Sequence, residues 1–144
     1  MAQKVTPPEY CKICGCLLNR KGNYATPTPQ GRAHATKHHF VAERFFGRSK
    51  TRKGSIRLPL FERCPWGLER EHDVFCYECH EILLHNPVFT RENIAAFADL
   101  VKQADLNEPE KTESREKLAR RIQLLQKIIE HGIKSLRSKG VCKA

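Results

Sequence analysis

Two Cys-x-x-Cys pairs stand far apart in the 144-residue chain, Cys11 with Cys14 and Cys76 with Cys79. Tetrahedral zinc takes four soft ligands, and each Cys-x-x-Cys turn presents two thiolates at once. A zinc ion between the two turns would join distant segments and replace part of the core of a small domain. A redox pair is the alternative, but neither pair lies in the βαβ pattern of a thioredoxin-like site. The spacing therefore predicts a structural zinc site with four cysteine ligands.

Three more cysteines complete a set of seven. Cys16 follows the first pair so closely that the choice of N-terminal ligands stays open at this point. Cys64 and Cys142 are expected to be free thiols. An odd count argues against a complete disulfide framework, and the N-terminal MAQKVTPPEYC lacks the apolar run of a secretory signal. We therefore expect a cytoplasmic protein whose cysteines bind metal.

Three histidines lie between the two Cys-x-x-Cys pairs or directly after the second pair. His38 and His39 are adjacent between the two pairs, and His80 follows Cys79. Side chains alternate along a strand, so one imidazole of an adjacent pair can reach a metal while its neighbour points at a water molecule. An imidazole titrates near neutral pH, as a general base requires. The pattern can therefore supply an activated water and a metal ion that acts as a Lewis acid, the two requirements of a metal-assisted hydrolysis.

The order of these motifs resembles the HNH nuclease superfamily, which has a ββα-metal fold. In that family a Cys-x-x-Cys pair precedes an Asp-His or His-His dipeptide, and a second pair ends beside a His or Asn that opens a helix. The resemblance covers residues 11 to about 87. It implies that His38 and His80 bind one catalytic divalent ion and that His39 is the general base. Histidine ligands widen the choice of ion to Mg²⁺, Mn²⁺, Ni²⁺ or Zn²⁺.

The chain departs from the family pattern at the residue that orients the general base. The family has an Asn nine residues before its final ligand, and the equivalent position in this chain is Glu71, with His72 beside it. Either side chain can hold His39 in one tautomer, so the sequence leaves the choice between them open.

A second departure concerns a third metal ligand. Colicin-type members of the family carry another His four residues after the position of His80, and this chain has Leu84 there. His85 is one residue further along, so we take it as the candidate third ligand. His34 and His131 receive no role.

The formal net charge is +10 and the pI is about 9.5. Basic residues dominate 31–70 and 111–144, whereas acidic residues dominate 71–110. This clustering favours nucleic acid as the partner over a membrane surface, because the first basic region lacks a clean amphipathic helix, and the nuclease resemblance implies DNA. The segment GRSKTRKGSIR lies just after the histidine pair and can grip phosphates. The predicted nucleic-acid contacts are Arg44, Arg48, Lys50, Arg52, Lys53 and Arg57.

The pattern of the chain predicts an α+β fold. Residues 1–10 form a flexible lead-in, 11–89 form the ββα-metal core with its zinc knuckle, and 90–144 form a helical extension. Thr90 caps a predicted helix over RENIAAFADLVKQADL, and a second helix runs from about residue 112 to about 136. The second helix carries one apolar stripe, and it can pack on the domain, pair with a second copy or lay its arginines along DNA. The stripe consists of Leu118, Ile122, Leu125, Ile129, Ile133 and Leu136.

We therefore interpret the chain as a small metal-dependent DNA endonuclease that associates with the nucleoid when bound to DNA. Two alternatives remain at this stage. One is a non-catalytic zinc-knuckle module that binds nucleic acid through its basic faces. The other is a protein-interaction adaptor that acts through the long C-terminal helix.

Overall fold

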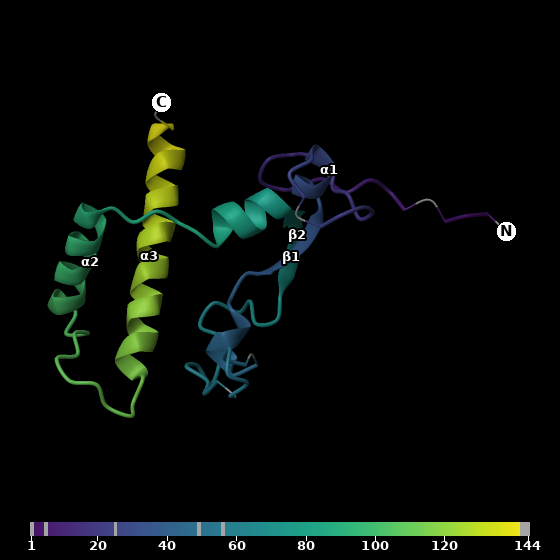
Figure 1. Ribbon diagram of the computed structural model, residues 1–144. Helices are drawn as coiled ribbons and strands as arrows, with labels where there is room; N and C mark the ends of the chain where they lie inside the picture. The colour runs from purple at the N-terminus through teal and green to yellow at the C-terminus, as the bar shows by residue number, and fades with distance from the viewer. Residues whose placement is uncertain (1, 5, 25, 49, 56, 142–144) are drawn as a thin grey trace.

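The protein is described here from a computed structural model, whose described residues are 2–4, 6–24, 26–48, 50–55 and 57–141. Cys142, a predicted free thiol, lies outside these ranges. The fold is α+β, with a small sheet in the N-terminal part and two long helices side by side in the C-terminal part (Figure 1). In order, the elements are α1 (Pro29–Arg32), β1 (Ala35–His39), η1 (Glu43–Phe46), β2 (His72–Cys76), η2 (Glu78–Leu84), α2 (Arg91–Gln103) and α3 (Glu116–Lys139).

The sheet consists of β1 and β2, which pair in antiparallel orientation. Ala35 lies opposite Cys76 at one end of the pair, and His39 lies opposite His72 at the other. Helix η2 follows β2 directly, so the chain has the strand–strand–helix order expected from its motifs. The sheet thus carries cysteine at one end and histidine at the other.

Helix η2 is a π-helix, a form with hydrogen bonds from residue i to residue i+5. The backbone N–H of His85 accordingly donates to the carbonyl oxygen of His80 at 3.3 Å. Such helical turns are rare and are frequently found at functional sites. The sequence predicted a helix after Cys79 but not its π form.

The connection between the strands, residues 40–71, contains the short 3₁₀ helix η1 and otherwise irregular chain. Its centre is the buried Phe61. The rings of Phe45, Phe46 and Trp66 surround Phe61 with centroid distances of 5.9, 6.4 and 5.6 Å. These aromatic residues therefore form a small core of their own.

Helix α2 begins at the predicted cap, because the hydroxyl of Thr90 accepts from the Asn93 N–H and the Asn93 side chain accepts from the Thr90 N–H. Helix α3 begins at Glu116 and ends at Lys139, a few residues later at each end than predicted. The first half of its apolar stripe is half-buried, whereas Ile129, Ile133 and Leu136 are exposed. A homodimer through this face stays a prediction.

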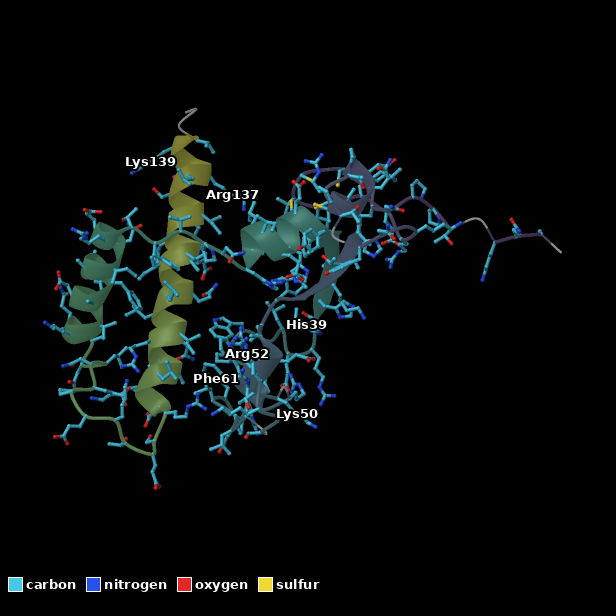
Figure 2. All side chains as sticks on the ribbon, in the orientation of Figure 1. His39, Lys50, Arg52, Phe61, Arg137 and Lys139 are labelled. Carbon is cyan, nitrogen blue, oxygen red and sulfur yellow. The ribbon has the colours of Figure 1, made fainter. Side chains whose placement is uncertain are left out.

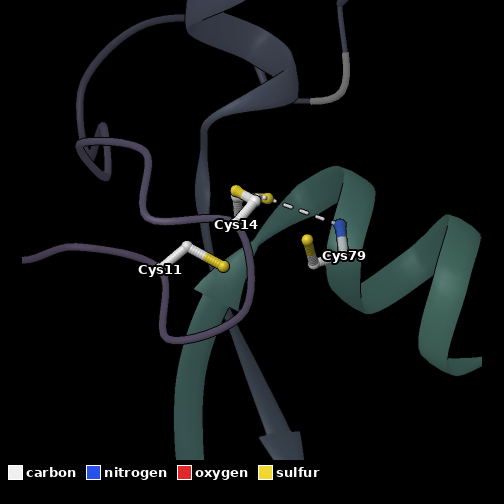
Figure 3. Close-up of side chains that lie close together, drawn as sticks. Cys11, Cys14 and Cys79 are labelled. Atoms are coloured by element: carbon white, nitrogen blue, oxygen red, sulfur yellow. Dashed lines mark hydrogen bonds between the residues drawn. The ribbon is translucent and has the colours of Figure 1, made fainter. Parts of the chain in front are cut away.

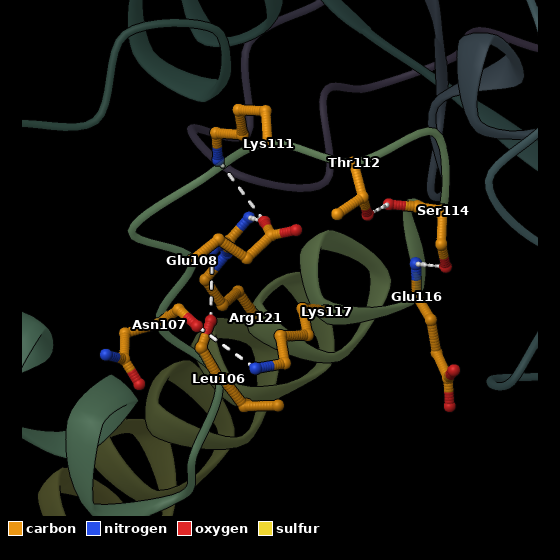
Figure 4. Close-up of polar contacts among 9 residues, drawn as sticks. All are labelled: Leu106, Asn107, Glu108, Lys111, Thr112, Ser114, Glu116, Lys117 and Arg121. Carbon is orange, nitrogen blue, oxygen red and sulfur yellow. Dashed lines mark hydrogen bonds and ion pairs between the residues drawn. The ribbon is translucent and has the colours of Figure 1, made fainter.

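Polar side chains close the loop between the two helices (Figure 4). The carboxylate of Glu108 accepts from Arg121 at 2.6 Å and from Lys111 at 3.2 Å. Arg121 also donates to the carbonyl oxygen of Leu106. These contacts hold the pKa of Glu108 below its usual range, mainly through the Arg121 hydrogen bond. Charged side chains thus fix the loop together with the buried side chain of Leu106.

The helical hairpin contacts the strand connection through α3. Arg115 donates to the carbonyl oxygen of Leu58 at 3.2 Å. Ile122 and Leu125 line an apolar cavity together with Phe40 and Trp66. Among the described residues, the helices contain no apolar stretch of the length that a bilayer span requires.

Candidate metal centres

Four thiols gather where the N-terminal loop meets the junction of β2 and η2. The sulfur atoms of Cys11, Cys14, Cys76 and Cys79 all lie within 4.8 Å of one another, and we call these residues the four-cysteine group. The Sγ atoms of Cys14 and Cys76 are 3.8 Å apart. A tetrahedral zinc ion with bonds of about 2.3 Å requires sulfur atoms at about this separation. The four-cysteine group is therefore placed to bind a metal ion.

Backbone hydrogen bonds shape both cysteine turns. The N–H of Gly15 donates to the carbonyl oxygen of Cys11 at 2.8 Å, and Gly15 has a φ of 80°, which favours glycine. In the second turn, the N–H of Cys79 donates to the sulfur of Cys76 at 3.4 Å (Figure 3). Each turn therefore presents its sulfur atoms through short local hydrogen bonds.

The position of Cys16 answers the question that the sequence left open. Cys16 packs beside the cluster, but the group of convergent sulfur atoms contains Cys11 and Cys14. Burial and the neighbouring sulfurs raise the pKa of Cys16 to about 12. Burial alone would also raise the pKa of Cys11, but backbone N–H donors outweigh it and lower the value to about 6. Cys11 thus forms the metal-binding thiolate more readily than Cys16 does.

Three imidazoles form a second cluster, the three-histidine group. Ligand nitrogens of His38, His80 and His85 lie within 4.8 Å of one another. The ring centroids are 5.0 Å apart for His38 and His80, 5.7 Å for His38 and His85, and 4.4 Å for His80 and His85. Imidazole nitrogens suit zinc, nickel and similar ions, whereas Mg²⁺ prefers oxygen ligands. The three-histidine group is therefore also placed to bind a metal ion.

The environment of this group favours neutral imidazoles. Burial lowers the pKa of His38, and the neighbouring histidines His80, His85 and His39 lower it further. Burial also lowers the pKa of His80, although Glu81 opposes the effect. A neutral ring keeps the lone pair that a metal ligand needs. At neutral pH both side chains are therefore in the form that binds a cation.

The π form of η2 explains why His85 joins the group although Leu84 occupies the α-helical position. In an α-helix, residues i and i+4 share a face, and residue i+5 is displaced round the axis. In η2 the hydrogen bonds span five residues, so residue i+5 lies closer to the face of residue i than it does in an α-helix. Leu84 instead packs against the buried cysteines. The wider turn therefore lets Leu84 pack on the cysteine side while His85 reaches the three-histidine group.

An open cleft of about 860 Å³ adjoins the three-histidine group. Its lining includes His38, His39, Glu43, Arg44, His80 and His85. His39 lies across the strand pair from His72, with ring centroids 5.4 Å apart. The predicted general base therefore lines the same cleft as the candidate metal ligands.

Sequence reasoning missed Glu43. Its carboxylate oxygen Oε1 lies 3.5 Å from Nε2 of His39. Glu43 is four residues after His39, a spacing that brings two side chains together only where the chain turns. The chain does turn there, because β1 ends at His39 and η1 begins at Glu43. The segment HHFVAERFF fits both a strand and a short helix, and this ambiguity was the signal in the sequence for a change of structure between His39 and Glu43.

Glu71 and His72, the two residues predicted to orient His39, differ in position. His72 faces His39, as described above, whereas the exposed Glu71 holds the chain through its backbone. The carbonyl oxygen of Glu71 accepts from the N–H of Phe40 at 3.2 Å. Of the two, His72 is therefore the one whose side chain adjoins His39.

No family model, curated protein or solved structure matches the chain.

The predicted phosphate contacts fall into two sets. Arg44, Lys50, Arg52 and Lys53 are exposed. Figure 2 shows Lys50 and Arg52 in the same part of the molecule as His39, away from Arg137 and Lys139 at the end of α3. Arg48 and Arg57 are half-buried. Arg48 donates to Glu69 at 2.7 Å and lies over the ring of Phe46, so its charge is already used within the fold.

Proposed function

We propose that the protein is a metal-dependent endonuclease with an HNH-type ββα-metal core that hydrolyses phosphodiester bonds of DNA. The observation that carries this proposal is the convergence of three imidazoles beside a fourth, His39, in one open cleft. A buried structural histidine would not need three such neighbours. The strand–strand–helix order and the adjoining four-cysteine group support the same reading.

His38, His80 and His85 are the residues that would hold the divalent ion. Their neutral nitrogens fit such an ion, and three protein ligands leave coordination positions free for substrate. A divalent ion bound there supplies a Lewis acid for the negative charge that develops on the phosphate. The four-cysteine group, in contrast, would hold a structural zinc.

His39 would act as the general base. Its imidazole takes a proton from the attacking water as the new P–O bond forms and the bond to the leaving sugar oxygen breaks. The carboxylate of Glu43 lies 3.5 Å from Nε2 of His39 and favours a hydrogen on that nitrogen. Nδ1 would then be the nitrogen that accepts the proton from water. The carboxylate also stabilises the imidazolium that results. His72 limits the space into which the ring can rotate.

The exposed basic side chains would bind the DNA backbone. Arg44 lines the cleft itself, and Lys50, Arg52 and Lys53 lie on the following loop. Contacts of this kind position a duplex without reading its sequence, and they weaken as salt concentration rises. Arg48 and Arg57 would instead stabilise the loop that carries them.

A plasmid-nicking assay with Mg²⁺, Mn²⁺, Co²⁺, Ni²⁺ or Zn²⁺ tests the proposal. We expect nicking that depends on added metal and is lost in His39→Ala but kept in His131→Ala, which removes an exposed histidine on α3. Salt-sensitive DNA binding without nicking by any metal would favour the non-catalytic nucleic-acid-binding module. Absence of salt-sensitive DNA binding would favour the adaptor.

A further inference from the structure

Thr36 is a buried polar residue that lies behind the three-histidine group. It sits on β1, is 7% exposed, and faces the equally buried His80. Its hydroxyl oxygen is 3.1 Å from the carbonyl oxygen of Phe75 and 2.8 Å from Nδ1 of His80. The hydroxyl therefore joins a β2 carbonyl to one nitrogen of a candidate metal ligand.

The hydrogen count of this chain of contacts fixes the direction of each bond. A carbonyl oxygen can only accept, so the single hydroxyl hydrogen of Thr36 points to Phe75. The hydroxyl oxygen must then accept from the His80 ring, and Nδ1 of that ring must carry a hydrogen. A neutral His80 consequently has its lone pair on Nε2, the nitrogen on the far side of the ring from the hydroxyl.

This tautomer is the one that a metal ligand requires here. A neutral imidazole offers one lone pair, and a histidine that binds a metal through one nitrogen usually donates its other N–H to a fixed acceptor. The opposite tautomer would put a hydrogen on Nε2 and leave Nδ1 as an acceptor. In that state Nδ1 and the carbonyl of Phe75 would compete for the one hydroxyl hydrogen of Thr36.

Glu81 is a weaker partner of both rings, and its Oε1 lies 3.5 Å from Nδ1 of His80, beyond the 2.8 Å contact with Thr36. Nδ1 of His85 lies 3.3 Å from Oε2 of Glu81, and the Glu81 side chain is 32% exposed. Solvent can therefore replace Glu81, whereas the contact between Thr36 and His80 is buried. The inner contact is thus the stronger constraint on the geometry of the group.

We propose that Thr36 is a positioning residue that locks His80 in the Nδ1–H tautomer, so that Nε2 is presented to a divalent cation. This inference rests on the proposed metal centre, but it does not require nuclease activity. Thr36→Val removes the hydroxyl and keeps the branched shape, whereas Thr36→Ser keeps the hydroxyl.

Two measurements test the proposal on full-length protein with zinc in the four-cysteine group. The first is ¹⁵N NMR of the His80 ring at pH 7.5, without added metal. We expect a hydrogen on Nδ1 in the wild type and in Thr36→Ser, and a mixture of tautomers in Thr36→Val. A hydrogen on Nε2 in the wild type would overturn the proposal, and this result needs no variant to fold.

The second measurement is the affinity of the three-histidine group for Co²⁺, followed by visible absorption. We expect Thr36→Val to weaken binding by about 10- to 100-fold and Thr36→Ser to bind like the wild type. Equal affinity in Thr36→Val, or a wild type that binds no Co²⁺ beyond the four-cysteine group, would overturn the proposal. Loss of DNA cleavage alone would count against the proposed function and not against this one.

Discussion

The four-cysteine group and the three-histidine group take ligands from the same short stretch of chain, but the first is largely closed to solvent and the second is open to it. Cys79 and His80 are neighbours, and each belongs to a different group. Three of the four cysteines are buried, and the thiols converge from two segments of chain. The histidines open into a cleft, with His85 exposed. Closed four-ligand sites are typical of structural zinc, and three-ligand sites with open positions are typical of catalytic metals.

The comparison teaches that one turn of chain can supply ligands to a closed metal site and to an open one at once. A buried group with all its ligands satisfied leaves no position for substrate, so its contribution is to folding. A group that faces a cleft leaves such positions at the cost of weaker burial. The π form of η2 is what allows Leu84 to pack on the first group while His85 reaches the second.

Loss of one cysteine ligand is expected to have the largest effect. Cys76→Ser should remove zinc and unfold the sheet region, because metal binding to structural zinc sites contributes on the order of 10 kcal/mol or more to folding. Metal analysis and thermal unfolding followed by circular dichroism measure both. Cys64→Ser, which changes a half-buried cysteine outside the group, is the matched control and should keep zinc and fold. A folded Cys76→Ser protein would remove the structural role from the four-cysteine group.

Loss of His39, the proposed general base, should affect cleavage alone. General-base catalysis contributes about 10²- to 10⁴-fold to rate, so His39→Ala should slow plasmid cleavage by that order while Co²⁺ affinity is retained. His38→Ala should lose both cleavage and Co²⁺ affinity. Parallel cleavage and Co²⁺ titrations separate the two variants. Equal loss of metal affinity in His39→Ala would mean that this histidine is a ligand.

An effect of intermediate size is expected from changes to the position of the histidine at the end of η2. His85→Ala should weaken Co²⁺ binding, because it removes one of three ligands. The double variant Leu84→His/His85→Ala places the histidine at the α-helical position and should not restore binding, since residue 84 packs on the cysteine side. Restored affinity in the double variant would show that the turn is α-helical in solution.

Much of this arrangement could be predicted from the sequence because it depends on local spacing. The Cys-x-x-Cys turns and the Thr90 cap are each formed within a few residues, and the adjacent His38 and His39 must point to different sides of a strand. The sequence predicted Cys11 and Cys14 as ligands but left doubt over Cys16, because the choice depends on how the turn closes. Glu43, Thr36 and the π form of η2 were missed because each requires the folded path of the chain.

The basic segment shows the same limit. All six predicted phosphate contacts look alike in the sequence, yet Arg48 is engaged with Glu69 and Phe46 inside the fold. Its partners lie at positions that no regular pattern links to it. The half-buried Arg57 lines a cavity with Leu118 and Ile122 of α3. The positive charge of the segment could be predicted from the sequence, but which of its side chains are free to contact phosphate could not.

The smallest expected effect concerns pH. Burial lowers the pKa of His38 in the folded protein, whereas an unfolded histidine titrates at about 6.5. As pH falls below about 6.5, the unfolded chain binds a proton that the folded chain resists, so stability is lost. Urea unfolding at pH 7 and pH 5.5 should show a smaller loss for His38→Gln than for the wild type. Equal losses would mean that His38 titrates normally in the folded protein.

The central claim is that the two groups do different jobs, and removal of metal in stages tests it most directly. Protein with both groups filled is titrated with a mild chelator, and plasmid cleavage and circular dichroism are read from the same samples. We predict that cleavage disappears while the folded spectrum and one equivalent of zinc remain, and that added Co²⁺ or Ni²⁺ restores cleavage. Loss of cleavage and fold together at every chelator concentration, or cleavage that survives loss of the more weakly bound metal, would contradict the account.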